Sequence, residues 1–326
     1  MRKERNRIIE DDILPIEETI TELADSNQPL LSSRLADLSD LNPEQLRLLD
    51  DVWERIEPKR RRQIIFRLVE LAEDNIGLNF DAIFRHRLKD QDEEVRSIAI
   101  EGLWENEETS LIEPLINLME QDSSAKVQAA AALALGRFAM LAEHQKLPPD
   151  YTSRPSQVLL ATFGNGSKPI EVRCRVLEAV APLSLPKVRR SIAEAYHSGN
   201  SKLKISALYA MGKNCDPYWL SILRMELASA DAEVRYEAAS ACGELGEDEA
   251  VVNLIELTDD VDADVQLAAV QALGKIGGSE AKNHLEKCLK HQSEAVCQVA
   301  AQALHELEVT KEPLSPHDLS YGELND

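Results

Sequence analysis

One apolar position recurs at a regular interval along most of this chain. Five copies follow one another at spacings of 31 residues, and two earlier copies precede them at spacings of 32 and 45 residues. These seven positions, which we call the anchors, are Val95, Val127, Val172, Leu203, Val234, Val265 and Val296. A period of this length is typical of proteins built from stacked copies of one supersecondary unit.

The residues around each anchor predict a helix. Three residues before the anchors stand Asp92, Ser124, Pro169, Asn200, Asp231, Asp262 and Ser293, and six of these seven side chains can accept a hydrogen bond from a helix's first turn. Positions 0, +4, +7 and +8 share one helical face, and +4 is alanine in every repeat except at Val176. We therefore expect a helix to begin within about two residues of each capping residue, and its small residues to admit a neighbouring helix closely.

Glycines and a second apolar set complete the unit. Gly136, Gly212, Gly243 and Gly274 stand at +9, and Gly246 and Gly277 stand at +12. Because glycine suits the left-handed residue that ends a helix, these glycines are predicted to end the first helix, except that the second repeat's helix is expected to continue past Gly136 to about Ala142. A second helix is indicated by Leu115, Ile192, Leu223, Leu254 and Leu285, all at +20. The predicted fold is all-α, a right-handed superhelical α-solenoid of stacked helical pairs.

Two segments carry a family resemblance. The stretches DAEVRYEAASACGELG and DADVQLAAVQALGKIG, which begin at Asp231 and Asp262, resemble the HEAT-like repeats named after phycobilin lyases. The resemblance extends over residues 80–308. It implies the helical-pair solenoid, but it leaves function open, because scaffolds, adaptors, bilin lyases and deoxyhypusine hydroxylases share this repeat.

The resemblance and the period divide the chain into three parts. Residues 1–79 are predicted to form a divergent N-terminal helical cap, with Asn42 capping a helix that begins at Pro43. Residues 80–308 form the repeat array, with an insertion near 137–154 that either contributes to a binding face or is a plain surface loop. Residues 309–326 are predicted to be a disordered acidic tail, with a short docking motif as the alternative.

Composition points to a cytoplasmic protein. No apolar stretch approaches the ~18 residues that span a bilayer, and the charged start lacks a signal peptide's apolar core. The five cysteines show no pairing pattern, which fits reduced thiols. A net charge of −22 repels phosphate backbones, so no nucleic-acid partner is expected. The basic clusters at 59–63 and 85–89 are interpreted as a solvated face, or as binding an acidic partner or the chain's own acidic surface.

The resemblance to the hydroxylases can be checked against the residues. It implies His-Glu pairs at the second and third positions after the anchors, where they would hold iron. None of the seven slots here carries such a pair, only Glu237 keeps one half, and His305–Glu306 lies out of phase. We therefore expect no catalytic residue, metal or cofactor and no stoichiometric iron. A bilin lyase stays open as an alternative, because it needs a groove rather than a motif.

The sequence also indicates a binding surface. Positions +3, +6 and +10 of the first helix are predicted to point outward on the concave side. The candidate binding residues there and beside them are Arg175, Tyr209, Lys213, Tyr236, Glu237, Glu244, Gln271 and Lys275. The two tyrosines are interpreted either as interface anchors or as covers of the seams between repeats. The predicted function is a non-catalytic scaffold or adaptor for a protein partner. A HEAT-like modifying enzyme is the alternative, and nucleic-acid binding is a weaker one.

Overall fold

The structure, a computed structural model, describes residues 15–26 and 28–309. The predictions for the charged start and for the acidic tail beyond residue 309 lie outside these residues. The described residues form eighteen α-helices and four short 3-10 helices, and no strand occurs among them. The chain divides into two compact units, which we call unit 1 (Met1–Phe138) and unit 2 (Ala139–Asp326).

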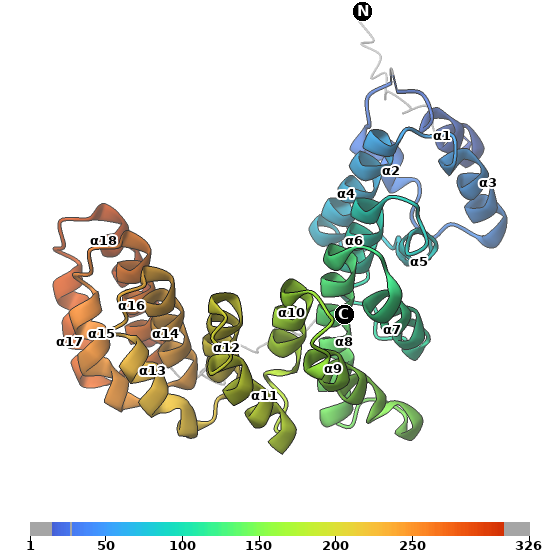
Figure 1. Ribbon diagram of the computed structural model, residues 1–326. Helices are drawn as coiled ribbons and strands as arrows, with labels where there is room; N and C mark the ends of the chain where they lie inside the picture. The colour runs from blue at the N-terminus through green and yellow to red at the C-terminus, as the bar shows by residue number, and fades with distance from the viewer. Residues whose placement is uncertain (1–14, 27, 310–326) are drawn as a thin grey trace, which may run out of the picture. The chain divides into compact units, whose positions relative to one another are not determined.

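Unit 1 contains the N-terminal helices (Figure 1). They are α1 (Ile16–Glu22), α2 (Ser32–Ala36), α3 (Pro43–Trp53), α4 (Pro58–Asp74), α5 (Asp81–Arg87), α6 (Glu93–Gly102) and α7 (Ile112–Gln121). The next helix, α8 (Ala125–Glu143), runs across the boundary between the units. Helix α4 packs against both α2 and α6, while α1 packs against α3. The predicted cap at Asn42 is confirmed, because its side chain accepts hydrogen bonds from two backbone N–H groups of α3.

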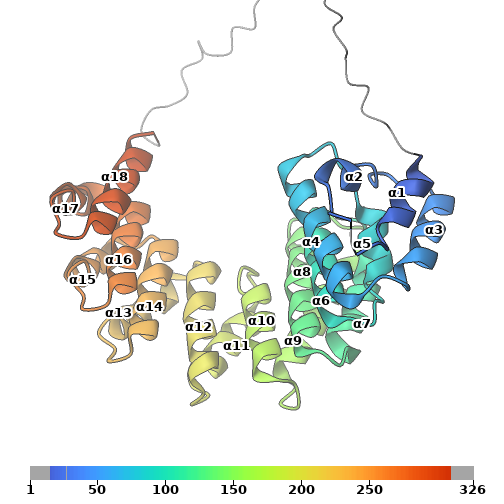
Figure 2. The same cartoon turned by 90° about the horizontal axis from the view of Figure 1, so that it is seen from above.

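Unit 2 is a stack of helical pairs. Its helices are α9 (Arg154–Gly164), α10 (Ile170–Val180), α11 (Pro186–Tyr196), α12 (Ser201–Asn214), α13 (Leu220–Glu226), α14 (Ala232–Leu245), α15 (Val251–Leu257), α16 (Ala263–Ile276), α17 (Gly278–Cys288) and α18 (Glu294–Val309). Helices α10, α12, α14, α16 and α18 pack consecutively in one layer. Within unit 2 this first-helix layer lies on the inner side of the curved stack, and α13, α15 and α17 lie on the outer side (Figure 2).

The predicted helix starts are confirmed in all seven repeats. Each first helix begins at the residue after its capping position. The side chains of Asp92, Asn200, Asp231 and Asp262 accept backbone N–H hydrogen bonds as caps. The anchors are all buried, as are the +4 residues and the five apolar residues at +20. The repeat pattern therefore records the hydrophobic core of the stack.

The two sets of glycines play different roles, and the prediction that the +9 set ends helices is wrong. Gly246 and Gly277 do follow α14 and α16, with φ angles of +77° and +72°. Gly212, Gly243 and Gly274 instead lie inside helices. A Cβ on Gly243 would lie 2.8 Å from the Cα of Ala272 on the next first helix. The +9 glycine is thus required by close helix packing against the +7 alanine of the following repeat.

A polar side chain at +1 links several neighbouring repeats. Arg96 and Arg235 each lie 2.8 Å from an aspartate, Asp122 and Asp260 respectively, in the loop before the next first helix. These four side chains are only 7–12% exposed, so solvent screens the paired charges less than on an open surface. The pairs therefore hold successive repeats in register.

Helix α4 shows the same arrangement within the predicted N-terminal cap. The Arg61 guanidinium lies 3.1 Å from Asp90 in the loop before α6, so Arg61 occupies the +1 slot. The anchor slot then falls on Arg60, which is buried and donates to the carbonyl oxygens of Leu23 (2.6 Å) and Gln28 (2.9 Å). The pattern of apolar anchors does not extend to this repeat-like helix, because its anchor position holds a hydrogen-bonded arginine.

The arginines of the basic clusters pair with carboxylates of the chain, while Lys59 and Lys89 are exposed to solvent. Arg62 pairs with Asp92 at 2.8 Å, and Arg85 pairs with Glu108 at 2.7 Å. Arg87 is buried, pairs with Asp50 and lies over the ring of Trp53. The alternative that the clusters bind the chain's own acidic residues therefore holds for these arginines. Their positive charge contributes to the cohesion of unit 1.

Helix α8 departs from one expectation of the sequence. Among the described residues it alone is long and apolar enough, by length and composition, to cross a membrane. The expectation that no stretch approaches this length is thus wrong for α8. However, 56% of its apolar window is buried inside the protein, as in the core helix of a repeat stack.

Candidate functional site

The candidate binding residues lie on four consecutive first helices of unit 2. Arg175 is on α10, Tyr209 and Lys213 are on α12, and Tyr236, Glu237 and Glu244 are on α14. Gln271 and Lys275 follow on α16. We call the surface formed by these eight residues the first-helix ridge.

The first part of the ridge joins α10 to α12. Glu178 forms an ion pair with Arg175 one turn earlier on the same helix. Its other carboxylate oxygen accepts a hydrogen bond of 2.7 Å from the Ser206 hydroxyl on α12. Glu178 is 11% exposed, whereas Arg175 is 50% exposed. The Glu178 carboxylate is therefore fixed by Ser206, and it holds the exposed Arg175 guanidinium at the surface.

The second part of the ridge crosses three helices. The Lys213 ammonium donates to one Glu244 oxygen at 3.0 Å, and the Lys275 ammonium donates to the other at 2.5 Å. The hydrogen bond from Lys275 is the main reason that the pKa of Glu244 is lowered, and Lys213 adds to it. Lys213 also lies 5.8 Å from the centre of the Tyr209 ring. This network fixes two lysines and a tyrosine in defined positions.

Glu237 differs from its neighbours. Burial raises the pKa of this carboxyl to about 7, and the charges of Glu178 and Glu233 act in the same direction. Lys213 opposes the shift without cancelling it. A carboxyl with such a pKa changes its charge near neutral pH, which makes this part of the ridge sensitive to pH.

The sequence assignment of outward positions holds only in part. At +3, Ser206 and Ala268 are buried, whereas Arg175 at the same position is exposed. At +6 and +10, Tyr209, Gln271 and Lys275 are exposed as expected. Tyr236 at +2 is 41% exposed. The exposed ridge is therefore narrower than the sequence indicated.

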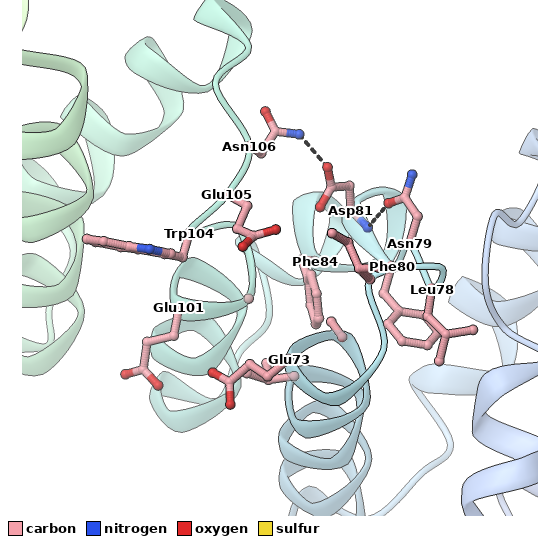
Figure 3. A pocket seen from close by; sticks show the side chains of 14 residues that line it. Glu73, Leu78, Asn79, Phe80, Asp81, Phe84, Glu101, Trp104, Glu105 and Asn106 are labelled. Atoms are coloured by element: carbon pink, nitrogen blue, oxygen red, sulfur yellow. Dashed lines mark hydrogen bonds between the residues drawn. The ribbon is translucent and has the colours of Figure 1, made fainter. Parts of the chain in front are cut away.

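A second candidate site, in unit 1, was missed by the sequence analysis. It is a pocket of about 740 Å³ between α4, α5 and α6, which we call the Trp104 pocket (Figure 3). Fourteen residues line it, four of which are carboxylates and none of which is basic. Trp104 occupies the +9 position, which holds a glycine in four other repeats. This replacement is the feature of the sequence that could have indicated the pocket.

Neither site resembles a metal centre. Across residues 15–26 and 28–309, no group of three or more His, Cys, Asp or Glu side chains is arranged to hold a metal ion. His305 lies within α18 rather than at a helix end, and it is exposed. The cysteines among these residues are unpaired, and burial raises the pKa of Cys242 to about 12, so its thiol stays protonated at neutral pH.

Comparison with known proteins identifies the repeat. The family model described as HEAT repeats matches residues 82–149 and 220–305. Similar solved structures include the complex of CpcE and CpcF of phycocyanin lyase from Nostoc sp. PCC7120, at 17% identity and a TM-score of 0.49, covering 87% of this chain and 97% of that one. Human deoxyhypusine hydroxylase in complex with glycerol is similar at 20% identity and a TM-score of 0.34, covering 80% of this chain and 95% of that one. No curated protein matches the chain.

Proposed function

Because the chain is a HEAT-like repeat protein, we propose that it is a non-catalytic scaffold or adaptor that binds a partner protein in the cytoplasm. The partner contacts the first-helix ridge of unit 2. The observation that carries this proposal is the network of Lys213, Glu244 and Lys275, which crosses three helices beside the exposed ring of Tyr209.

The ridge has the chemistry of a protein interface. Its two tyrosines are about two-fifths exposed, and such aromatic side chains are frequent hot spots of binding. The lysines and Arg175 are already held by carboxylates, so a partner would meet side chains that lose less conformational entropy on binding. The mixed charges favour a polar protein surface as partner. They do not favour a nucleic acid, because the net charge of the chain is −22.

Site-specific crosslinking tests the location of the interface. A photo-crosslinking residue replaces Gln271, which is exposed on the ridge, or Glu286, which is exposed on the outer helix α17. We expect the same partner to be crosslinked in native extract from Gln271 and not from Glu286. Equal crosslinking from both positions, or crosslinking from Glu286 alone, would contradict the proposed surface.

Truncation of a ridge tyrosine tests its contribution to affinity. We expect Tyr209→Ala to weaken binding of that partner by more than about 1 kcal/mol while leaving thermal stability nearly unchanged. Tyr218→Ala is the matched control, because Tyr218 is also exposed but lies outside the first-helix layer. Titration calorimetry and thermal melts measure both quantities. Unchanged affinity for Tyr209→Ala, or equal loss for both variants, would remove Tyr209 from the interface.

Metal analysis addresses the hydroxylase-type alternative. Such an enzyme would hold iron tightly, whereas we expect the purified chain to carry no stoichiometric iron. Elemental analysis by mass spectrometry after growth in iron-supplemented medium checks this. One or more iron atoms per chain would replace the scaffold proposal by an enzymatic one.

A further inference from the structure

The floor of the Trp104 pocket is apolar and closely packed. Phe84 is 1% exposed and packs edge-to-face against Phe80, with ring centres 6.3 Å apart. A Cβ on Gly102 would lie 2.7 Å from the Phe84 ring, so the helix passes directly over this ring. Ile76 and Trp104 add exposed apolar surface at the edge, being 99% and 60% exposed. An aliphatic side chain entering the pocket would therefore find apolar contacts.

The same pocket carries an excess of negative charge. Glu73 from α4 and Glu101 from α6 lie close together, whereas Glu105 lies apart from them, next to Trp104 in the loop after α6 (Figure 3). In the part of the chain that the structure describes, none of these three carboxylates has an ion-pair partner. The nearby cations are already engaged, because Lys126 pairs with Glu94 and Arg137 pairs with Glu107 at 3.0 Å.

The surroundings of Glu101 disfavour its charged form. Burial raises the pKa of Glu101, and the charges of Glu94 and Glu73 add to the shift. Lys126 and a hydrogen bond from Ser97 act against it without restoring the ordinary pKa value. A cation bound between Glu73 and Glu101 would relieve this repulsion. The remaining carboxylate, Asp81, is instead held by a hydrogen bond of 2.5 Å from the Asn106 amide.

We propose that the Trp104 pocket binds a lysine or arginine side chain from a basic segment of a partner protein. The aliphatic stem lies on the floor formed by Phe84, and the cationic head lies between Glu73 and Glu101. The indole of Trp104 is 60% exposed and has the Arg137 guanidinium 5.6 Å from its ring centre, so it adds apolar surface at the edge of the pocket rather than a free cation-binding face. Ligand pockets span roughly 300–1,000 Å³, so 740 Å³ accommodates one such side chain together with its flanking residues.

This inference differs from the proposed function in site and in ligand. The pocket lies in unit 1, whereas the first-helix ridge lies in unit 2. Its binding is therefore expected to be unaffected by Tyr209→Ala, which distinguishes failure of one proposal from failure of the other.

Peptide titration tests the pocket. A fluorescein-labelled tetralysine peptide is titrated with the full chain at low ionic strength and followed by fluorescence anisotropy. The matched peptide carries acetylated lysines, which keep the stem and lose the charge. We expect the charged peptide to bind and the acetylated peptide to bind at least about tenfold more weakly. Equal binding of both peptides would overturn the proposal.

Because the whole chain is acidic, the variants must separate the pocket from general attraction. The double variant Glu73→Gln/Glu101→Gln is compared with Glu44→Gln/Glu54→Gln, which removes the same charge from two exposed glutamates at the ends of α3. We expect about tenfold weaker binding for the pocket variant and less than about twofold for the control. Equal weakening of both variants would assign binding to diffuse charge and overturn the proposal.

Two further variants complete the test. Trp104→Ala is expected to weaken binding several-fold, and Trp104→Phe is expected to restore most of it, because a large apolar ring is retained at the edge of the pocket. Thermal melts check that each variant is folded. A chain lacking residues 1–12 addresses the chain's own basic start, which contains Arg2, Lys3, Arg5 and Arg7. Binding by this shortened chain without binding by the full chain would overturn the proposal, because it would give the pocket to that segment.

Discussion

Two glutamates on α14 illustrate how neighbours decide the behaviour of a single residue. Glu244 accepts hydrogen bonds from two lysines on adjacent helices, and its pKa is lowered. Glu237, two turns earlier on the same helix, is desolvated and faces the charges of Glu178 and Glu233, and its pKa is raised to about 7. A glutamate carboxylate therefore stabilises the stack at position 244, whereas the charged form is destabilised at position 237.

This contrast predicts a pH-dependent effect of Glu237→Gln. The folded pKa of about 7 exceeds the ordinary value of 4.5, so the folded chain binds more protons between these values. Stability due to Glu237 is thus lost as pH rises through that window. Glutamine removes the loss, and we expect the variant to be about 1 kcal/mol more stable than the parent at about pH 8, with little difference at about pH 4.5.

Urea unfolding at the two pH values measures the effect of Glu237→Gln. Glu286→Gln is the control, since Glu286 is exposed on α17. A gain for Glu237→Gln that is equal at both pH values, or that is larger at the acidic one, would contradict the assigned pKa.

At the scale of elements, the spacing of first helices depends on the pairing of a +9 glycine with the next repeat's +7 alanine. The site for a Cβ on Gly212 lies 2.8 Å from the Cα of Ala241, and the equivalent site on Gly243 lies 2.8 Å from the Cα of Ala272. Because the obstacle is backbone, it cannot move aside as a flexible side chain could. The distance between successive first helices therefore depends on the absence of a side chain at the +9 position.

We expect alanine to destabilise the chain at both Gly243 and Gly246, but for different physical reasons. Gly243→Ala improves helix propensity, yet it should lower stability by about 1–3 kcal/mol because the methyl group overpacks the interface. Gly246→Ala meets no neighbouring atom, but its φ of +77° should cost about 1 kcal/mol. Chemical denaturation gives both values. An increase in stability for Gly243→Ala would refute the close-packing role of the +9 glycine.

At the scale of the whole molecule, each repeat in unit 2 contacts chiefly the repeats beside it. Helix α14 packs on α12 and on α16, and Ala238 at its centre is fully buried. In such an array stability is approximately a sum of repeat terms and nearest-neighbour terms. Damage to one repeat should therefore weaken adjacent repeats and spare distant ones.

The substitution Ala238→Leu tests this local coupling. The added atoms should overpack the seam and cost roughly 1–3 kcal/mol. Hydrogen exchange is expected to lose protection in α12, α14 and α16 while protection in α4 and α6 of unit 1 stays unchanged. Tyr209→Ala is the comparison, because its ring is partly exposed and its loss should leave protection intact. Uniform loss of protection along the chain would contradict nearest-neighbour behaviour.

The 31-residue period was enough to predict the helical-pair fold, the helix starts and most of the buried residues. This was possible because the capping residue and the apolar stripe are local features of the sequence, and both recur in each repeat. The exposure of Tyr209 and Lys275 could be predicted for the same reason. The helix α4 could not be placed in the pattern, since its anchor Arg60 is satisfied by two carbonyl groups that only the folded chain brings near.

The remaining features depend on contacts between repeats. The +9 glycines were assigned to helix ends because glycine allows both a left-handed turn and a close approach, and only the neighbouring helix decides between them. Contacts across the stack likewise set the opposite pKa shifts of Glu237 and Glu244. They also bring Glu73 and Glu101 into one pocket. Periodicity specifies which face of a helix is buried, whereas pKa values and pockets depend on the particular residues that the facing helix supplies.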